Sequence, residues 1–137
     1  MPERATIARA KRDKAEGKAP STQAGEFVRE EMDHIREGKH GARSTKQAIA
    51  IGLSKARRSG VALPPPKAGQ TSSRTRKNAA RALAAGRRRT AGAASETRSK
   101  AASRALKREP RSAASHRALS KHAKQAATRR RRQQSEK

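Results

Sequence analysis

Residues 44–60 read STKQAIAIGLSKARRSG, and this stretch decides what kind of fold the chain can form. The opening letters STKQ make a capping box, in which the Ser44 hydroxyl accepts from the Gln47 amide and the Gln47 side chain returns to the Ser44 amide. Gly60 is suited to end a helix. Apolar or small residues recur between these signals at helical spacing: Ala48, Ile49, Gly52, Leu53 and Ala56. The stretch therefore predicts one helix.

A second helix is predicted immediately before this one, over residues 21–38, STQAGEFVREEMDHIREG. Ser21 or Thr22 is suited to cap its start, and Gly38 follows its last periodic residue as a stop signal. Its acidic side chains fall mostly away from its apolar stripe, which predicts a solvated acidic face. The stripe itself has spacing i, i+4 and i+7: Val28, Met32 and Ile35.

The two helices together predict an αα-hairpin, the only part of the chain expected to bury a core. Gly52 lies inside the second helix, where glycine costs about 1 kcal/mol relative to alanine, and its lack of a side chain favours close approach of the helices. Val61 and Leu63 can fold back onto the pair before the prolines at 64–66 prevent further helix. A hairpin of about 45 residues is near the lower size limit for a stable core. We therefore expect a homodimer or bound nucleic acid to complete its order.

The composition limits how much more of the chain can fold. Its 137 residues include 36 Lys and Arg against 11 Asp and Glu, a net charge of +25, with one Phe and neither Trp nor Tyr. Residues 1–66 carry a net +6 and residues 67–137 a net +19. Low hydrophobicity with high net charge is typical of disordered chains. The expected fold class is mostly α, a small helical hairpin mini-domain at 21–63 between largely disordered basic arms at 1–20 and 64–137.

Several classes of function are disfavoured by what the sequence lacks. Without cysteine there is no disulfide, thiolate metal site or cysteine nucleophile. No apolar run of membrane-spanning length and no secretory apolar segment is present, so we expect a cytoplasmic, nucleoid-associated protein and no membrane partner. No Gly-rich phosphate loop or nucleophile elbow occurs either. We expect a protein that is not an enzyme and has no cofactor.

Two sets of histidines raise the question of a metal site. Glu31 and His34 have the Glu-x-x-His spacing of di-iron bundles, but such sites need two of these motifs and further glutamates. His34 and His40 are six residues apart, as are His116 and His122, with no cysteine to complete a zinc site. The sequence therefore predicts ordinary surface side chains and no metal site.

The cationic second arm points to nucleic acid. A polycation binds phosphate by releasing condensed counterions, which needs charge density and no particular geometry. Ala-rich segments of this arm have good helix propensity, so we expect them to be coil alone and to gain helix when phosphate neutralises their repulsion. The residues predicted to contact phosphate are the two densest arginine runs and a basic face of the second helix: Arg87, Arg88, Arg89, Arg129, Arg130, Arg131, Arg132, Lys46, Lys55, Arg57 and Arg58.

Duplex DNA is favoured over RNA as the partner. Sequence-specific RNA modules stack bases on aromatic side chains, which this chain lacks, and no RRM, KH or OB signature is present. A helix-turn-helix with Thr45, Lys46 and Gln47 opening a recognition helix is disfavoured because the connection is longer than the usual turn. The prediction is histone-like binding of double-stranded DNA without sequence preference. The alternatives are an RNA- or ribosome-associated protein, and a protein-interaction module that binds through its acidic first helix.

The span from Thr22 to Pro66 resembles a family of small basic bacterial proteins of uncharacterised function. The hallmark of that family is S-x-K-Q-A-I-A-I-x-L-S-x-A, which this chain matches from Ser44 to Ala56. The Lys/Arg/Ala composition of the second arm separately resembles bacterial histone-H1-like proteins. The first resemblance implies a soluble bacterial protein and no particular activity; the second implies a DNA-binding tail.

Overall fold

The computed structural model describes residues 2–88 and 96–135, which form a mostly helical chain. None of the helices described is long and apolar enough to cross a membrane. Six α-helices and one short 3-10 helix follow in order: α1 (Arg4–Ala15), α2 (Pro20–Arg36), α3 (Thr45–Arg58), α4 (Ser73–Arg88), α5 (Glu96–Arg108), η1 (Ser112–Ala114) and α6 (His116–Ser135).

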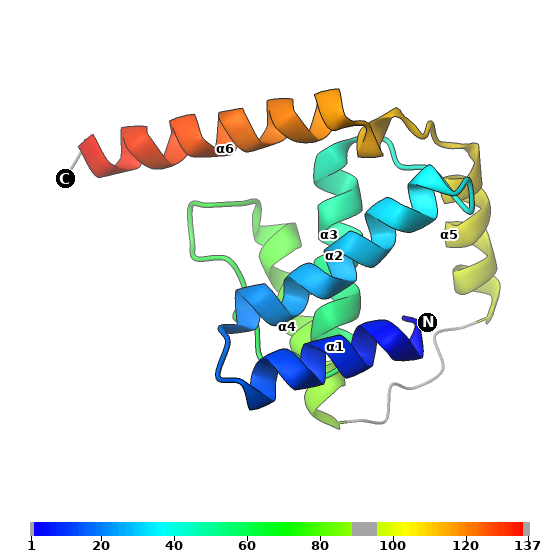
Figure 1. The fold of residues 1–137 in the computed structure, drawn as a ribbon, viewed down its shortest axis with the longest axis horizontal. Helices are drawn as coiled ribbons and strands as arrows, with labels where there is room; N and C mark the ends of the chain where they lie inside the picture. The colour runs from blue at the N-terminus through cyan, green and yellow to red at the C-terminus, as the bar shows by residue number, and fades with distance from the viewer. Residues whose placement is uncertain (1, 89–95, 136–137) are drawn as a thin grey trace.

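Helices α2 and α3 pack together as the predicted hairpin and lie at the centre of the molecule (Figure 1). The expected close approach at Gly52 is confirmed, because a Cβ placed there would lie 2.7 Å from the Cα of Val28. The stop signal is confirmed as well: Gly38 has φ +79°, and the amide of the next residue, Lys39, donates to the carbonyl of His34 at 3.0 Å.

The helix starts differ in detail from the predicted caps. The Ser44 Oγ does accept from the Gln47 amide at 3.1 Å, but the Gln47 side chain accepts from the amide of Arg43, one residue earlier than expected. Helix α2 begins at Pro20 after an extended Ala19 and has no side-chain cap, so the predicted role of Ser21 or Thr22 is wrong. Proline suits this position because the first helical amides have no partner within the helix.

The core is divided into two clusters, one at the turn end of the hairpin and one at its open end. One cluster contains Met32, Ile35, Ala42, Ala48, Ala113 and Ala114. The other contains Ala10, Ala24, Phe27, Ala56 and Val61. Three of these alanines come from outside the predicted mini-domain, so segments of both arms help to bury the hairpin. The hairpin is therefore covered by its own chain.

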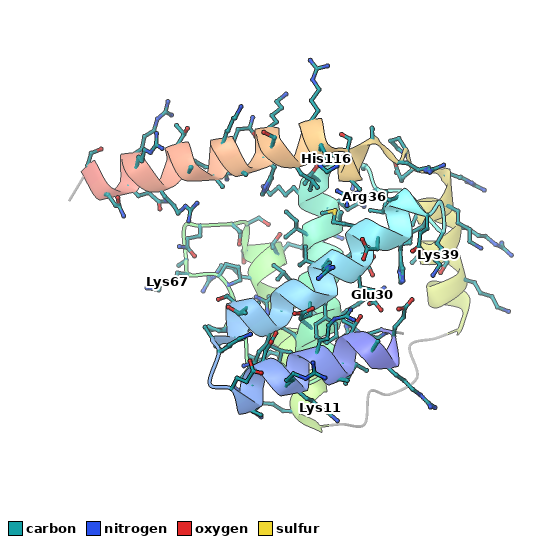
Figure 2. The ribbon with its side chains drawn as sticks, viewed as in Figure 1. Lys11, Glu30, Arg36, Lys39, Lys67 and His116 are labelled. Atoms are coloured by element: carbon teal, nitrogen blue, oxygen red, sulfur yellow. The ribbon has the colours of Figure 1, made fainter. Side chains whose placement is uncertain are left out.

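The expected disordered arm at residues 1–20 is not what the structure shows for residues 4–15, which form helix α1 against α2. Glu30, on the α1-facing side of α2 (Figure 2), accepts from the amide of Glu3 at 2.6 Å and from the hydroxyl of Thr6 at 3.3 Å. Arg9 pairs with Glu26 at 3.1 Å. Helix α1 is thus held to α2 by polar contacts and by the burial of Ala10 against Phe27 in the second core cluster.

The second arm contacts the hairpin through α4, through residues 106–111 and through η1. The amide of Gly41 in the hairpin turn donates to the carbonyl of Leu106 at 2.8 Å. Helix α4 packs on α3 so closely that a Cβ at Gly86 would collide with the carbonyl of Arg57. Further along, the hydroxyl of Thr45 donates to the carbonyl of Ala113 at 2.5 Å, and Arg36 Nε donates to the carbonyl of Ala114 at 3.1 Å. These contacts fix η1 against the start of α3, and α6 begins directly after it.

Candidate nucleic-acid interface

Helix α6 is attached at one end only. Its cap is Ser115, whose Oγ accepts from the amide of Ala118 at 3.1 Å, and Leu119 packs in part against the core. None of its residues is buried, and its C-terminal half extends beyond the other helices (Figure 1). Twenty residues make a helix about 30 Å long. Over most of this length, side chains of α6 point into solvent on most sides of the helix (Figure 2).

The cations of α6 are not spread evenly around it. Successive residues of an α-helix are rotated by about 100°, so the four consecutive arginines at 129–132 point in different directions, and Arg130 lies opposite Arg132 to within about 20°. Earlier cations of α6 line up with Arg132 along one face. Arg131 lies within about 40° of Arg117 on the same face. We call this set the α6 stripe: Arg117, Lys121, Lys124, Arg131 and Arg132.

A second group of cations surrounds a hollow between α1, α3 and α4, with a volume of about 570 Å³. Its floor includes the buried side chains of Phe27 and Val61. Lys11, Lys14 and Arg58 form no ion pair with any described residue, so their charges remain available. We call the four exposed cations on its rim the basic hollow: Lys11, Lys14, Arg58 and Arg87.

Two of the predicted phosphate contacts have other partners. The ammonium of Lys55 pairs with the buried carboxylate of Glu31. Arg57 is only 6% exposed and donates to the carbonyls of Leu63 at 3.1 Å and Pro64 at 3.0 Å, where burial lowers the pKa of its guanidinium. Both side chains serve the fold, so the predicted basic face of α3 is reduced to Lys46 and Arg58.

The remaining predicted residues are divided between the two ends of α3. Lys46 is exposed in the first turn, beside the start of α6, whereas Arg58 and Arg87 lie at the other end, about 18 Å along the helix axis. Arg88 is the last residue of α4, and Arg89 lies outside the described residues. The structure therefore presents two separate basic surfaces in place of one.

Sequence reasoning missed several of these cations. Lys11 and Lys14 reach the basic hollow because residues 4–15 are helical, and Gly17, with φ +78°, ends that helix. The signal was present as a helix-ending glycine after an amphipathic stretch. Lys121 and Lys124 were missed because the prediction considered only the densest runs of arginine. The alignment of these lysines on one face of α6 depends on their spacing along the sequence.

The geometry gives little support to recognition of DNA bases by the first turn of α3. Thr45, the first residue of the helix, is buried, and its hydroxyl is already bonded to the carbonyl of Ala113. The connection from α2 to α3 runs over residues 37–44. A helix that opens against another part of the same chain lacks the free first turn with which a recognition helix contacts bases.

The predicted surface position of Glu31 is wrong, since its side chain is completely buried. The side chains of His34 and His40 are each 14% exposed and lie beside it. The structure thus brings together three residues that the sequence analysis considered only in pairs, Glu31 with His34 and His34 with His40. They lie on α2 and in the following turn, and none of them belongs to either basic surface.

Comparison with known proteins finds one family. The sequence profile of DUF6496, a family of unknown function, matches residues 11–67. No curated protein and no solved structure matches the chain. The matched span covers the hairpin and only the last five residues of α1, and it stops before α4, so the similarity concerns the hairpin and not the second basic arm.

Proposed function

We propose that this protein binds double-stranded DNA without sequence preference, by neutralising backbone phosphates, as a histone-like component of the bacterial nucleoid. The observation that carries the proposal is α6, a helix of 20 residues with seven Lys and Arg, no Asp or Glu, and no buried residue. Charge density of this kind attracts a polyanion and releases its condensed counterions on binding. A helix of this diameter also fits the major groove of B-DNA.

The two basic surfaces supply enough charge for a substantial electrostatic contribution. The α6 stripe holds five cations and the basic hollow holds four, and the other cations of α6 add to the first. Engagement of about 8–12 phosphates gives a slope of log K against log salt on the order of −7 to −11 for B-DNA. Such binding is steep in salt and almost indifferent to sequence.

The alternatives differ in how well the described contacts support them. The alternative of a protein-interaction module uses the predicted acidic face of α2, where Glu30 is buried and Glu37 pairs with Lys39, which leaves Asp33 exposed. The single aromatic side chain, Phe27, is buried as well, which removes the base-stacking platform of single-strand RNA modules. Structured RNA remains a competitor, because A-form and B-form duplexes both present phosphates.

A variant that keeps the amino-acid composition of the chain tests the role of the α6 stripe. A variant with Lys121→Ala, Ala123→Lys, Arg132→Ala and Ala126→Arg moves two cations from the stripe to other faces of α6 and leaves the net charge at +25. If α6 binds as a helix, the salt slope measured by fluorescence anisotropy becomes shallower by about 2 units on unrelated duplexes. An unchanged slope would show that α6 acts as an unstructured polycation.

A separate variant tests DNA binding itself. Replacing Arg129, Arg130, Arg131 and Arg132 with Ala removes four charges. The slope should become shallower by about 2 units if only the α6 stripe contacts phosphate and by roughly 3–4 units if all four arginines do, with an equal loss on every duplex. Competition between duplex DNA and structured RNA identifies the preferred partner. A wild-type slope near −2, or a loss confined to one DNA sequence, would contradict phosphate neutralisation by the arm.

The arm is also proposed to gain order on binding. Helix α6 is held only at its first turns, so repulsion among its cations should keep a peptide of residues 112–135 mostly coil in low salt. Circular dichroism of that peptide should show helix only after duplex DNA is added. Stable helix in low salt without a polyanion would show that α6 needs no partner.

A further inference from the structure

We propose that Glu31, His34 and His40 form a binding site for a divalent transition-metal ion, with Zn²⁺ the best match. One ligand atom from each residue lies within 4.8 Å of those of the other two. Glu31 and His34 are separated by one helical turn on α2, and His40 follows in the connection to α3. The turn of the hairpin therefore brings two imidazoles and a carboxylate to one point.

The buried carboxylate is incompletely satisfied by protein groups. Glu31 Oε1 accepts from the ammonium of Lys55, whereas Oε2 is buried and has no hydrogen-bond donor. Nε2 of His40 lies 3.1 Å from that oxygen but lacks the geometry of a hydrogen bond. Ligands bound about 2.0–2.1 Å from a tetrahedral zinc ion are about 3.3 Å apart. The separation of the two atoms suits a shared metal ion.

The two imidazoles are held by contacts of the kind that orient metal ligands. Nδ1 of His40 lies 2.9 Å from the carbonyl oxygen of Gly41, and Nε2 of His34 lies 3.2 Å from Oε1 of Glu3. The rings are nearly perpendicular, at 83°, with centroids 6.1 Å apart. A carbonyl or carboxylate partner fixes the orientation of a metal-binding imidazole. Glu3 is accordingly a positioning residue of this site.

The charge and donor types define the class of ion. Glu3, Glu30 and Glu31 gather here against the ammonium groups of Lys39 and Lys55, so the neighbourhood is locally acidic within a chain of net charge +25. Two nitrogen donors and one oxygen donor suit zinc, whereas magnesium and calcium prefer oxygen alone. With three protein ligands, the fourth position is left for water.

Metal binding at this point would connect α2 to the start of the turn and stabilise the hairpin. An ion that binds only the folded chain raises the unfolding temperature with its concentration. This effect is independent of DNA binding, because the three ligands belong to neither the α6 stripe nor the basic hollow. The proposal therefore stands or fails separately from the proposed function.

The full chain offers a matched control for the experiment, since His116 and His122 form a second histidine pair with the same spacing. Isothermal titration with Zn²⁺ should show one saturable site, and a hundredfold excess over Kd should raise Tm by about 10 °C or more. His34→Gln and His40→Gln should each abolish that site and the rise in Tm. The double variant His116→Gln/His122→Gln should bind zinc like the wild type.

Two further measurements separate metal binding from a purely structural role. Co²⁺ in place of Zn²⁺ should give the visible absorption of a tetrahedral site in the wild type and none in His40→Gln, whose helical circular dichroism should be unchanged without metal. Glu3→Gln should weaken Zn²⁺ binding by about 10-fold or more. The absence of saturable binding, or equal loss in the His116/His122 control, would overturn the proposal.

Discussion

The hairpin and helix α6 are both helical, but they are held in that form by different means. Helices α2 and α3 bury Phe27 and Ile35 completely or nearly so, whereas α6, the longest helix, buries none of its residues. Burial of apolar side chains is the main source of helix stability in proteins, and propensity alone is marginal for about 12–15 residues or fewer. Helical content therefore does not measure stability, because α2 and α3 form a core whereas α6 is exposed on the surface.

The largest expected difference comes from deleting an apolar side chain in each region. Phe27→Ala should lower the free energy of unfolding by about 3–5 kcal/mol, since it leaves a cavity in the cluster of Ala24 and Val61. Leu119→Ala, at the half-buried base of α6, should cost about 1 kcal/mol or less. Urea denaturation followed by circular dichroism measures both. Comparable losses would mean that α6 is part of the same core.

Two glycines of the hairpin, Gly52 and Gly25, allow a crowded helix position to be compared with an open one. Gly52→Ala should destabilise the protein by about 1–3 kcal/mol, because its Cβ would lie 2.9 Å from Cγ2 and 2.7 Å from Cα of Val28. Gly25→Ala, in α2 with no atom within 4 Å of the new Cβ, should stabilise it by about 0.5–1 kcal/mol. Urea midpoints of the two variants should therefore move in opposite directions. A neutral Gly52→Ala would break the assignment of a tight α2–α3 contact.

The smallest expected effects come from removing one helix cap in each region. Ser44→Ala deletes the acceptor of the Gln47 amide at the start of α3 and should cost about 1 kcal/mol of global stability. Ser115→Ala deletes the equivalent acceptor at the start of α6, yet should change the global unfolding midpoint by less than about 0.5 kcal/mol because α6 buries nothing. Thermal unfolding and the helical signal of each variant distinguish the two. Equal shifts would show that α6 unfolds together with the hairpin.

The sequence by itself determined the hairpin. A glycine after each helix, the Ser44 cap and the spacing of Val28, Met32 and Ile35 act within a few residues, so they can be read before any tertiary contact is known. Gly52 could be assigned to close packing for the same reason, since glycine inside a helix needs an explanation that only its small size supplies. The excess of positive charge and its concentration after residue 66 could also be read directly from the sequence.

Only the tertiary structure decided which parts of the arms join the core and which charges remain free. The bond from Thr45 to Ala113 joins residues 68 positions apart, and alanine leaves no pattern that distinguishes a buried position from an exposed one. From the sequence, Arg57 and Lys55 look like solvent-exposed cations. In the structure, Arg57 donates to a backbone carbonyl and Lys55 pairs with a buried carboxylate. The meeting of Glu31 with His34 and His40 depends on the turn between two helices. Contacts between distant segments depend on how whole elements pack, and local composition does not encode that packing.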